Sequence, residues 1–150
     1  MSITDITKPV DLSIHAEGTG PKRSRQPVYV DFMPPCNSAC PAGENIQAWM
    51  AHAQGGDYYE AFQSIMEDNP FPAVMGRVCV KPCETGCNRN HIDTTVNIHA
   101  VERYIGDEAI AKGWEVRYKA VPTGKRILVI GAGPSGLSTA YHLTRLGHTV

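Results

Sequence analysis

Three stretches of the chain carry apolar residues at helical spacing. In each stretch the apolar side chains recur at every third or fourth position, so they would lie on one face of an α-helix. The apolar positions are Ile46, Trp49, Met50 and Ala53 in the first stretch, Tyr59, Phe62, Ile65 and Met66 in the second, and Ile98, Val101, Ile105 and Ala109 in the third. The pattern predicts three short helices whose apolar faces point into a core.

Turn and capping residues indicate where these helices begin and end. Gly55-Gly56 closes the first helix, and Asn69-Pro70 stops the second. Asp57 and Glu60 have the spacing of a capping box at the start of the second helix. The third helix should run from about Asn97 to Lys112, with Gly113 as its C-cap.

The segment from Pro70 to Cys87 breaks the helical pattern. Prolines and glycines are interspersed with three cysteines there, a composition that favours irregular loops over a helix or strand. Because the short helices would bury little apolar surface, such loops need another element to organise them. We therefore expect a metal centre to hold this part of the chain together.

The five cysteines all lie between Cys36 and Cys87. An odd number of cysteines in a chain without an export signal argues against a disulfide framework. Closely spaced thiolates on proline-containing loops suit an iron–sulfur cluster, and a four-ligand zinc site is the chemical alternative. The run Cys36-x3-Cys40-Pro41 matches the end of the bacterial ferredoxin motif, in which the last cysteine binds a different cluster from its predecessors. Five thiolates cannot complete two four-iron clusters.

A different pattern occupies the last part of the chain. The apolar run Arg126–Ile130 predicts a strand, and Pro134–Leu146, closed by Gly147, predicts a helix. The glycine fingerprint between them is typical of a turn that binds a dinucleotide pyrophosphate at the start of a helix. Its candidate binding residues are Gly131, Gly133, Pro134, Ser135 and Gly136. The residues themselves do not distinguish FAD from NAD(P) as the ligand. We expect the chain to stop inside this domain, as a fragment of a longer protein.

Composition narrows the functional classes. A net charge of −1 with 19% charged residues gives no field that would attract nucleic acid. Residues 1–27 lack a sustained period and are predicted to form an extended arm, and they lack the apolar stretch of a secretory signal. The longest aliphatic run, Ile127–Ile130, is far too short to cross a membrane. The prediction is a cytoplasmic protein without a nucleic-acid or membrane partner.

Taken in order, these motifs resemble the small, flavin-containing subunit of NADPH-dependent glutamate synthase and the corresponding N-terminal region of dihydropyrimidine dehydrogenase. The resemblance covers roughly residues 28–150. It rests on Cys36-x3-Cys40-Pro41, Asp68-Asn69-Pro70-Phe71-Pro72, Gly76-Arg77-Val78-Cys79, Pro82-Cys83-Glu84-x2-Cys87-Asn88, Val96-Asn97-Ile98, Glu102-Arg103-Tyr104-Ile105 and Gly131-Ala-Gly-Pro-Ser-Gly136. In this family a helical domain carries two 4Fe-4S clusters, and domains that bind FAD and NADPH follow it.

Carried over by position, the resemblance implies that Cys40, Cys79 and Cys83 bind one cluster. Glu102 stands where the family places a fourth, carboxylate or carboxamide ligand; taken as an isolated helix position, it would be a solvated acid. Cys36 and Cys87 would belong to the second cluster.

The family supplies two further cysteines, spaced Cys-x2-Cys, just before Cys36. This chain has Val28-Tyr-Val-Asp31 in their place. A valine cannot bind iron, so we expect one intact 4Fe-4S cluster.

The expected fold is a mainly α-helical, ferredoxin-like iron–sulfur domain over residues 28–122, followed by the first β-α unit of an α/β Rossmann-like domain over 123–150. The resemblance implies an NAD(P)H-dependent oxidoreductase that relays electrons between NAD(P)H, FAD and a partner subunit or domain, and the fragment alone would be inactive. Two alternatives remain open: an interaction adaptor with a degenerate cluster site, and a zinc-stapled binding module.

Overall fold

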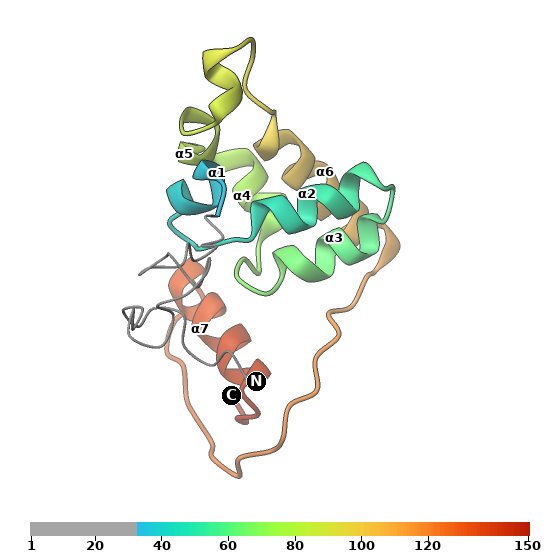
Figure 1. Ribbon diagram of the computed structural model, residues 1–150. Helices are drawn as coiled ribbons and strands as arrows, with labels where there is room; N and C mark the ends of the chain where they lie inside the picture. The colour runs from blue at the N-terminus through green and yellow to red at the C-terminus, as the bar shows by residue number, and fades with distance from the viewer. Residues whose placement is uncertain (1–32) are drawn as a thin grey trace, which may run out of the picture. The chain divides into compact units, whose positions relative to one another are not determined.

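The computed structural model describes residues 33–150 (Figure 1). The predictions for the arm 1–27, for Val28 and for Asp31 lie outside these residues. The helices are α1 (Pro35–Ala39), α2 (Ile46–Gln54), α3 (Tyr58–Ile65), α4 (Pro72–Val78), α5 (Pro82–Thr85), the 3₁₀ helix η1 (Asn88–His91), α6 (Ile98–Lys112) and α7 (Pro134–Arg145). None of these helices is long and apolar enough to cross a membrane. The described chain is therefore mainly helical, as expected.

The core forms where α2, α3 and α6 meet. Trp49 of α2, Ile65 of α3 and Ile105 of α6 are completely buried, and Ile46, Phe62 and Ile98 pack around them. These are positions of the three predicted apolar faces, which confirms the helices that the spacing predicted. Gly113 ends α6 in the left-handed conformation, with φ of 61°, as its predicted role as C-cap requires.

The predicted capping box at the start of α3 is wrong. The Asp57 side chain makes no capping hydrogen bond. Glu60, its expected partner, binds instead the guanidinium of Arg117, which lies far along the chain. The contact with the Arg117 guanidinium holds the Glu60 carboxylate on the helix surface and away from the Asp57 backbone N–H.

The prediction of irregular loops from Pro70 to Cys87 is also wrong, because α4 and α5 lie in this segment. Both helices begin with a proline, Pro72 and Pro82, whose fixed φ suits the first helical turn. The unpredicted helix α1 begins in the same way at Pro35. By composition these prolines indicate a loop, but in this structure each of them begins a helix.

Packing against α6 stabilises α4 at an unusually close helix crossing. A Cβ atom built on Gly76 of α4 would lie 2.5 Å from the Arg103 backbone. One built on Gly106 of α6 would lie 2.2 Å from the backbone nitrogen of Ala73. The two backbones touch because neither position carries a side chain. This contact fixes the end of α4, where Cys79 lies, relative to α6.

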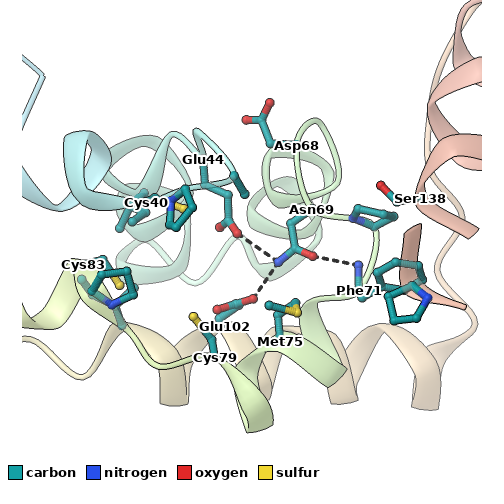
Figure 2. A pocket seen from close by; sticks show the side chains of 17 residues that line it. Cys40, Glu44, Asp68, Asn69, Phe71, Met75, Cys79, Cys83, Glu102 and Ser138 are labelled. Atoms are coloured by element: carbon teal, nitrogen blue, oxygen red, sulfur yellow. Dashed lines mark hydrogen bonds between the residues drawn. The ribbon is translucent and has the colours of Figure 1, made fainter. Parts of the chain in front are cut away.

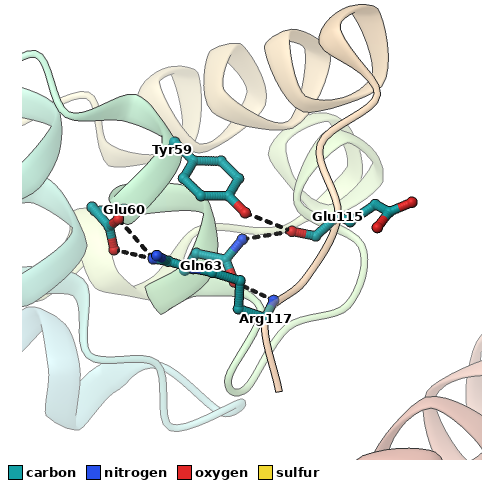
Figure 3. Close-up of polar contacts among 5 residues, drawn as sticks. All are labelled: Tyr59, Glu60, Gln63, Glu115 and Arg117. Carbon is teal, nitrogen blue, oxygen red and sulfur yellow. Dashed lines mark hydrogen bonds and ion pairs between the residues drawn. The ribbon is translucent and has the colours of Figure 1, made fainter. Parts of the chain in front are cut away.

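The segment after α6 is fastened to α3 by the side chain of Gln63 (Figure 3). Its Nε2 donates to the Glu115 carbonyl at 2.8 Å, and its Oε1 accepts from the Arg117 backbone N–H at 2.7 Å. The Tyr59 hydroxyl donates to the same Glu115 carbonyl at 3.1 Å, and the Arg117 guanidinium pairs with Glu60. We call these five residues the Gln63 clasp.

Replacing Gln63 with leucine should release the clasp. The change keeps the size of the side chain and removes two hydrogen bonds to the backbone, which should lower the free energy of unfolding by about 1–2 kcal/mol. Amide hydrogen exchange at residues 115–117 should also become faster. Urea denaturation and hydrogen exchange measure the two effects. Unchanged exchange at these residues would contradict the role assigned to Gln63.

The region of the glycine fingerprint contains α7 but no complete strand. A single parallel bridge joins Arg126 to Thr149, in place of the strand predicted over Arg126–Ile130. Gly131 has φ of 111°, and a Cβ on Gly136 would lie 2.1 Å from the Gly131 carbonyl oxygen. The turn thus has the tight, side-chain-free geometry of a dinucleotide fingerprint. The Rossmann-like domain itself stays a prediction.

Candidate iron–sulfur site

One cavity of about 380 Å³ contains all four residues that were predicted to bind a single cluster. Cys40, Cys79, Cys83 and Glu102 line it, and Figure 2 shows them around the same space. Most of the remaining wall is apolar and comes from Pro41, Ile46, Phe71, Met75, Pro82 and Ile98, with Pro134 and Ser138 of α7 at its edge. Residues distant in sequence are thus brought to one site with a largely apolar wall.

Helix ends position the three cysteines. Cys40 is the C-cap of α1, Cys79 is the C-cap of α4, and Cys83 lies in the first turn of α5. The turn between α4 and α5 passes through Lys81, whose φ of 51° is in the left-handed region. The Lys81 backbone N–H donates to the Cys79 sulfur at 3.3 Å.

Burial changes the chemistry of Cys83. Removal from water raises the pKa of its thiol to about 11, because the low-dielectric surroundings disfavour the thiolate. Iron binds the thiolate, so binding at this residue must displace a proton. Cys83 therefore becomes a negative sulfur donor only together with the metal.

A buried pair of acids lies on the opposite wall from Cys83. Glu44, Glu102 and the Asn69 between them are each at most 7% exposed. The Asn69 Nδ2 donates to Glu44 Oε1 at 3.0 Å and to Glu102 Oε1 at 2.8 Å. Burial, followed by the charge of Glu44, raises the pKa of Glu102 to about 8. Burial also raises the pKa of Glu44.

The raised pKa of Glu102 predicts how the metal-free protein responds to pH. Between the ordinary pKa of 4.5 and about 8, Glu102 is protonated when folded and ionised when unfolded. The folded state then binds more protons, so the free energy of unfolding falls as pH rises through this window. We expect a lower urea midpoint at a pH of about 8.5 than at about 5.5.

The variant Glu102→Gln should make this decline shallower, because the amide does not titrate. Glu108→Gln is a matched control on the same helix, since Glu108 pairs with Lys112 and has no contact with Asn69. It should keep the wild-type pH dependence. An equal decline in the Glu102→Gln variant would assign the effect to other groups.

Cys36 and Cys87 do not line this cavity. Burial raises the pKa of the Cys36 thiol, and the nearby Cys87 and Cys40 add to the rise. Hydrogen bonding from the Val96 backbone lowers the pKa of Cys87. The two thiols are therefore neighbours, as a shared second site would require, but they supply only two donors.

The arrangement of the possible ligands distinguishes between a single metal ion and a four-iron cluster. Among residues 33–150, no three His, Cys, Asp or Glu side chains converge closely enough to share one metal ion. A zinc ion needs four ligands within about 2.3 Å of one point, whereas each ligand of a four-iron cluster binds a different iron atom. Thiolates spread over the wall of one cavity fit a cluster better than a single ion.

Two polar residues of the site were missed in the sequence. From the sequence, Asn69 is only part of the signal that stops a helix, and Glu44 has no assigned role. Neither carries a periodic or spacing signal that indicates burial. Glu102 would be a solvated acid on an isolated helix, yet it is only 7% exposed because α4 and Asn69 cover it.

The fold and the cavity define a small helical domain of the iron–sulfur class. Residues 30–114 match the family described as dihydropyrimidine dehydrogenase domain II, 4Fe-4S cluster. The chain belongs to this family.

Relatives share this part of much longer proteins. The chain is 41% identical over 120 residues to a glutamate synthase (NADH) of Schizosaccharomyces pombe, covering 78% of this chain and 6% of that protein. It is 40% identical over 117 residues to the glutamate synthase (NADPH) small chain of Escherichia coli, covering 76% and 25%. It is 33% identical over 138 residues to an NADP(+)-dependent formate dehydrogenase subunit beta of Moorella thermoacetica, covering 77% and 20%. The chain thus spans a quarter or less of these relatives.

Proposed function

We propose that this chain is the N-terminal part of an NAD(P)H-dependent flavin and iron–sulfur oxidoreductase. Its helical domain would hold one 4Fe-4S cluster on Cys40, Cys79, Cys83 and Glu102. The observation that carries the proposal is that these four residues, chosen from the sequence, line one cavity. A bound cluster would supply one-electron transfer between donor and acceptor.

The residues of the site have separate tasks in this proposal. The three thiolates bind iron, and the Glu102 carboxylate provides the fourth ligand. The Lys81 N–H stabilises negative charge on the Cys79 sulfur. The apolar wall excludes water, and the hydrophobic shell around a metal group helps to set its reduction potential.

The glycine fingerprint is the proposed flavin site. Gly131, Gly133 and Gly136 shape the turn, and the backbone of Pro134 and Ser135 begins α7, whose N-terminal end favours a pyrophosphate. A Cβ on Gly133 would meet nothing within 4 Å, so the approach to this turn is open. The family resemblance favours FAD here, with NAD(P)H binding elsewhere in the whole protein.

The relatives do not agree on one electron acceptor. Relatives are named as glutamate synthases, a formate dehydrogenase subunit and an NADPH-Fe(3+) oxidoreductase subunit. Their names share a pyridine nucleotide and differ in the other reactant. We propose that the common step, transfer between NAD(P)H and a partner subunit or domain, occurs in this protein in the cytoplasm.

Metal analysis tests the proposal. Iron and acid-labile sulfide should be measured per chain after anaerobic reconstitution, with an EPR spectrum of the dithionite-reduced protein. About four irons with a cluster EPR signal support one 4Fe-4S cluster. About eight would mean that ligands near Cys36 and Cys87 complete a second. Zinc, or no metal, would reject the electron relay in favour of the stapled module or the adaptor.

A further inference from the structure

Three hydrogen bonds fix the amide side chain of Asn69 in one orientation. Its Oδ1 accepts from the Phe71 backbone N–H at 2.9 Å, so its Nδ2 must face the other way (Figure 2). The two Nδ2 hydrogens then point to the two buried acids, one to Glu44 and one to Glu102. Asn69 is itself only 5% exposed. The amide therefore connects the turn before α4 with both carboxylates.

In this arrangement, one oxygen of the Glu102 carboxylate accepts a hydrogen bond and the other accepts none from the described part of the chain. Asn69 donates to Oε1, and within residues 33–150 no hydrogen bond reaches Oε2. Glu102 lines the same cavity as the three cysteines. The hydrogen bond from Asn69 restrains the Glu102 carboxyl group and leaves Oε2 without a hydrogen bond from these residues.

We propose that Asn69 is a positioning residue that orients Glu102 for iron, with Glu44 as the second anchor of its amide. The inference rests on the proposed function, because it requires that Glu102 binds the cluster. Outer hydrogen bonds that orient a ligand commonly change metal affinity 10- to 100-fold. Asn69 suits this task because a neutral donor can lie between two acids without adding charge.

Removing the donor would leave Glu102 without the Asn69 hydrogen bond that holds its carboxyl group. A buried carboxyl group that loses its hydrogen bond is destabilised. Glu102 would then be free to adopt orientations that the amide excludes. The expected consequence is a cluster that is held less firmly and has an altered electronic environment.

Two substitutions separate this role from a purely structural one. Asn69→Asp keeps the oxygen that accepts from Phe71, and so preserves the turn, but it replaces the donor with a third acid. Asn69→Leu has a similar size and removes all three hydrogen bonds. Gln63→Leu is the matched control, because it removes an amide that also binds backbone groups but lies outside the cavity.

The full chain should be reconstituted with iron and sulfide, and its fold checked by circular dichroism. The rate of iron loss to a chelator and the EPR g-values of the reduced protein are then compared. We expect both Asn69 variants to lose iron at least about ten times faster than wild type, with shifted g-values, and Gln63→Leu to match wild type.

Other outcomes overturn the inference in distinguishable ways. Wild-type iron loss and g-values in Asn69→Asp would show that only the bond to Phe71 matters. A Glu102→Ala variant with the wild-type spectrum would remove Glu102 as a ligand and the inference with it. A wild-type protein without a cluster would reject the proposed function itself, before any variant is compared.

Discussion

Replacing Cys83 with alanine is expected to abolish the cluster, lowering iron from about four atoms per chain to less than one. Cys83 is buried in the first turn of α5 and faces the cavity that also contains Cys40 and Cys79. Among residues 33–150, Cys40, Cys79 and Cys83 are the thiols that line that cavity, so the variant has no spare thiolate to take the place of Cys83. Iron and sulfide analysis, with the visible absorption of the reconstituted protein, measures the loss.

Cys36→Ala is the matched control for this experiment. Cys36 is also partly buried and also near another thiol, but it lies outside the cavity. If the protein holds one cluster, this variant should keep about four irons. A Cys83→Ala variant that retains its iron, or a Cys36→Ala variant that loses all of it, would contradict the ligand set.

The second large effect is expected from Gly106→Ala. The added methyl group would lie 2.2 Å from the Ala73 nitrogen and 2.6 Å from its Cα. In a helix, alanine is more favourable than glycine by about 1 kcal/mol. The overlap of the new methyl group with the backbone of α4, however, can be relieved only by separating α4 from α6. We expect a net loss of about 2–3 kcal/mol in the free energy of unfolding, measured by urea denaturation.

The same substitution should also disturb the site. Because α4 carries Cys79 and α6 carries Glu102, separating the helices moves two proposed ligands apart. Gly55→Ala is the control, since Gly55 has φ of −73° and its nearest neighbours would be at 3.5 Å. It should change stability by no more than about 0.5 kcal/mol. Equal stability of the two variants would show that the crossing can relax.

The long helices could be predicted because their information is local. Helix α6 has apolar residues at helical spacing and a glycine at its end, and it appears where the sequence indicates. Helices α1, α4 and α5 could not be predicted in this way, since each has at most seven residues and begins with proline. They are stabilised by contacts with distant segments, as the approach of Gly76 to Arg103 shows. Composition alone contains no trace of such contacts.

The residues of the candidate site also differ in whether the sequence identified them. The rarity and spacing of the cysteines indicated a metal centre, and the family resemblance grouped Cys40, Cys79, Cys83 and Glu102 as one ligand set. Glu44 and Asn69 went unrecognised, because an acid and an amide are common surface residues. Only the fold shows that they are buried against each other. The assignment of Cys36 and Cys87 to the family's second site stays a prediction, as does the expectation of one intact cluster.

The Gln63 clasp shortens the free segment between the helical domain and residues 123–150. The clasp holds the backbone as far as Arg117, and Thr123 is held by the Gly147 carbonyl beside α7. Only residues 118–122 lie between these two anchors, and the six residue steps from Arg117 to Thr123 span at most roughly 22 Å. If residues 123–150 begin the proposed nucleotide-binding domain, a tether this short keeps that domain at a high effective concentration near the cavity. Lengthening the tether should then slow the proposed electron transfer between the two centres without changing either one.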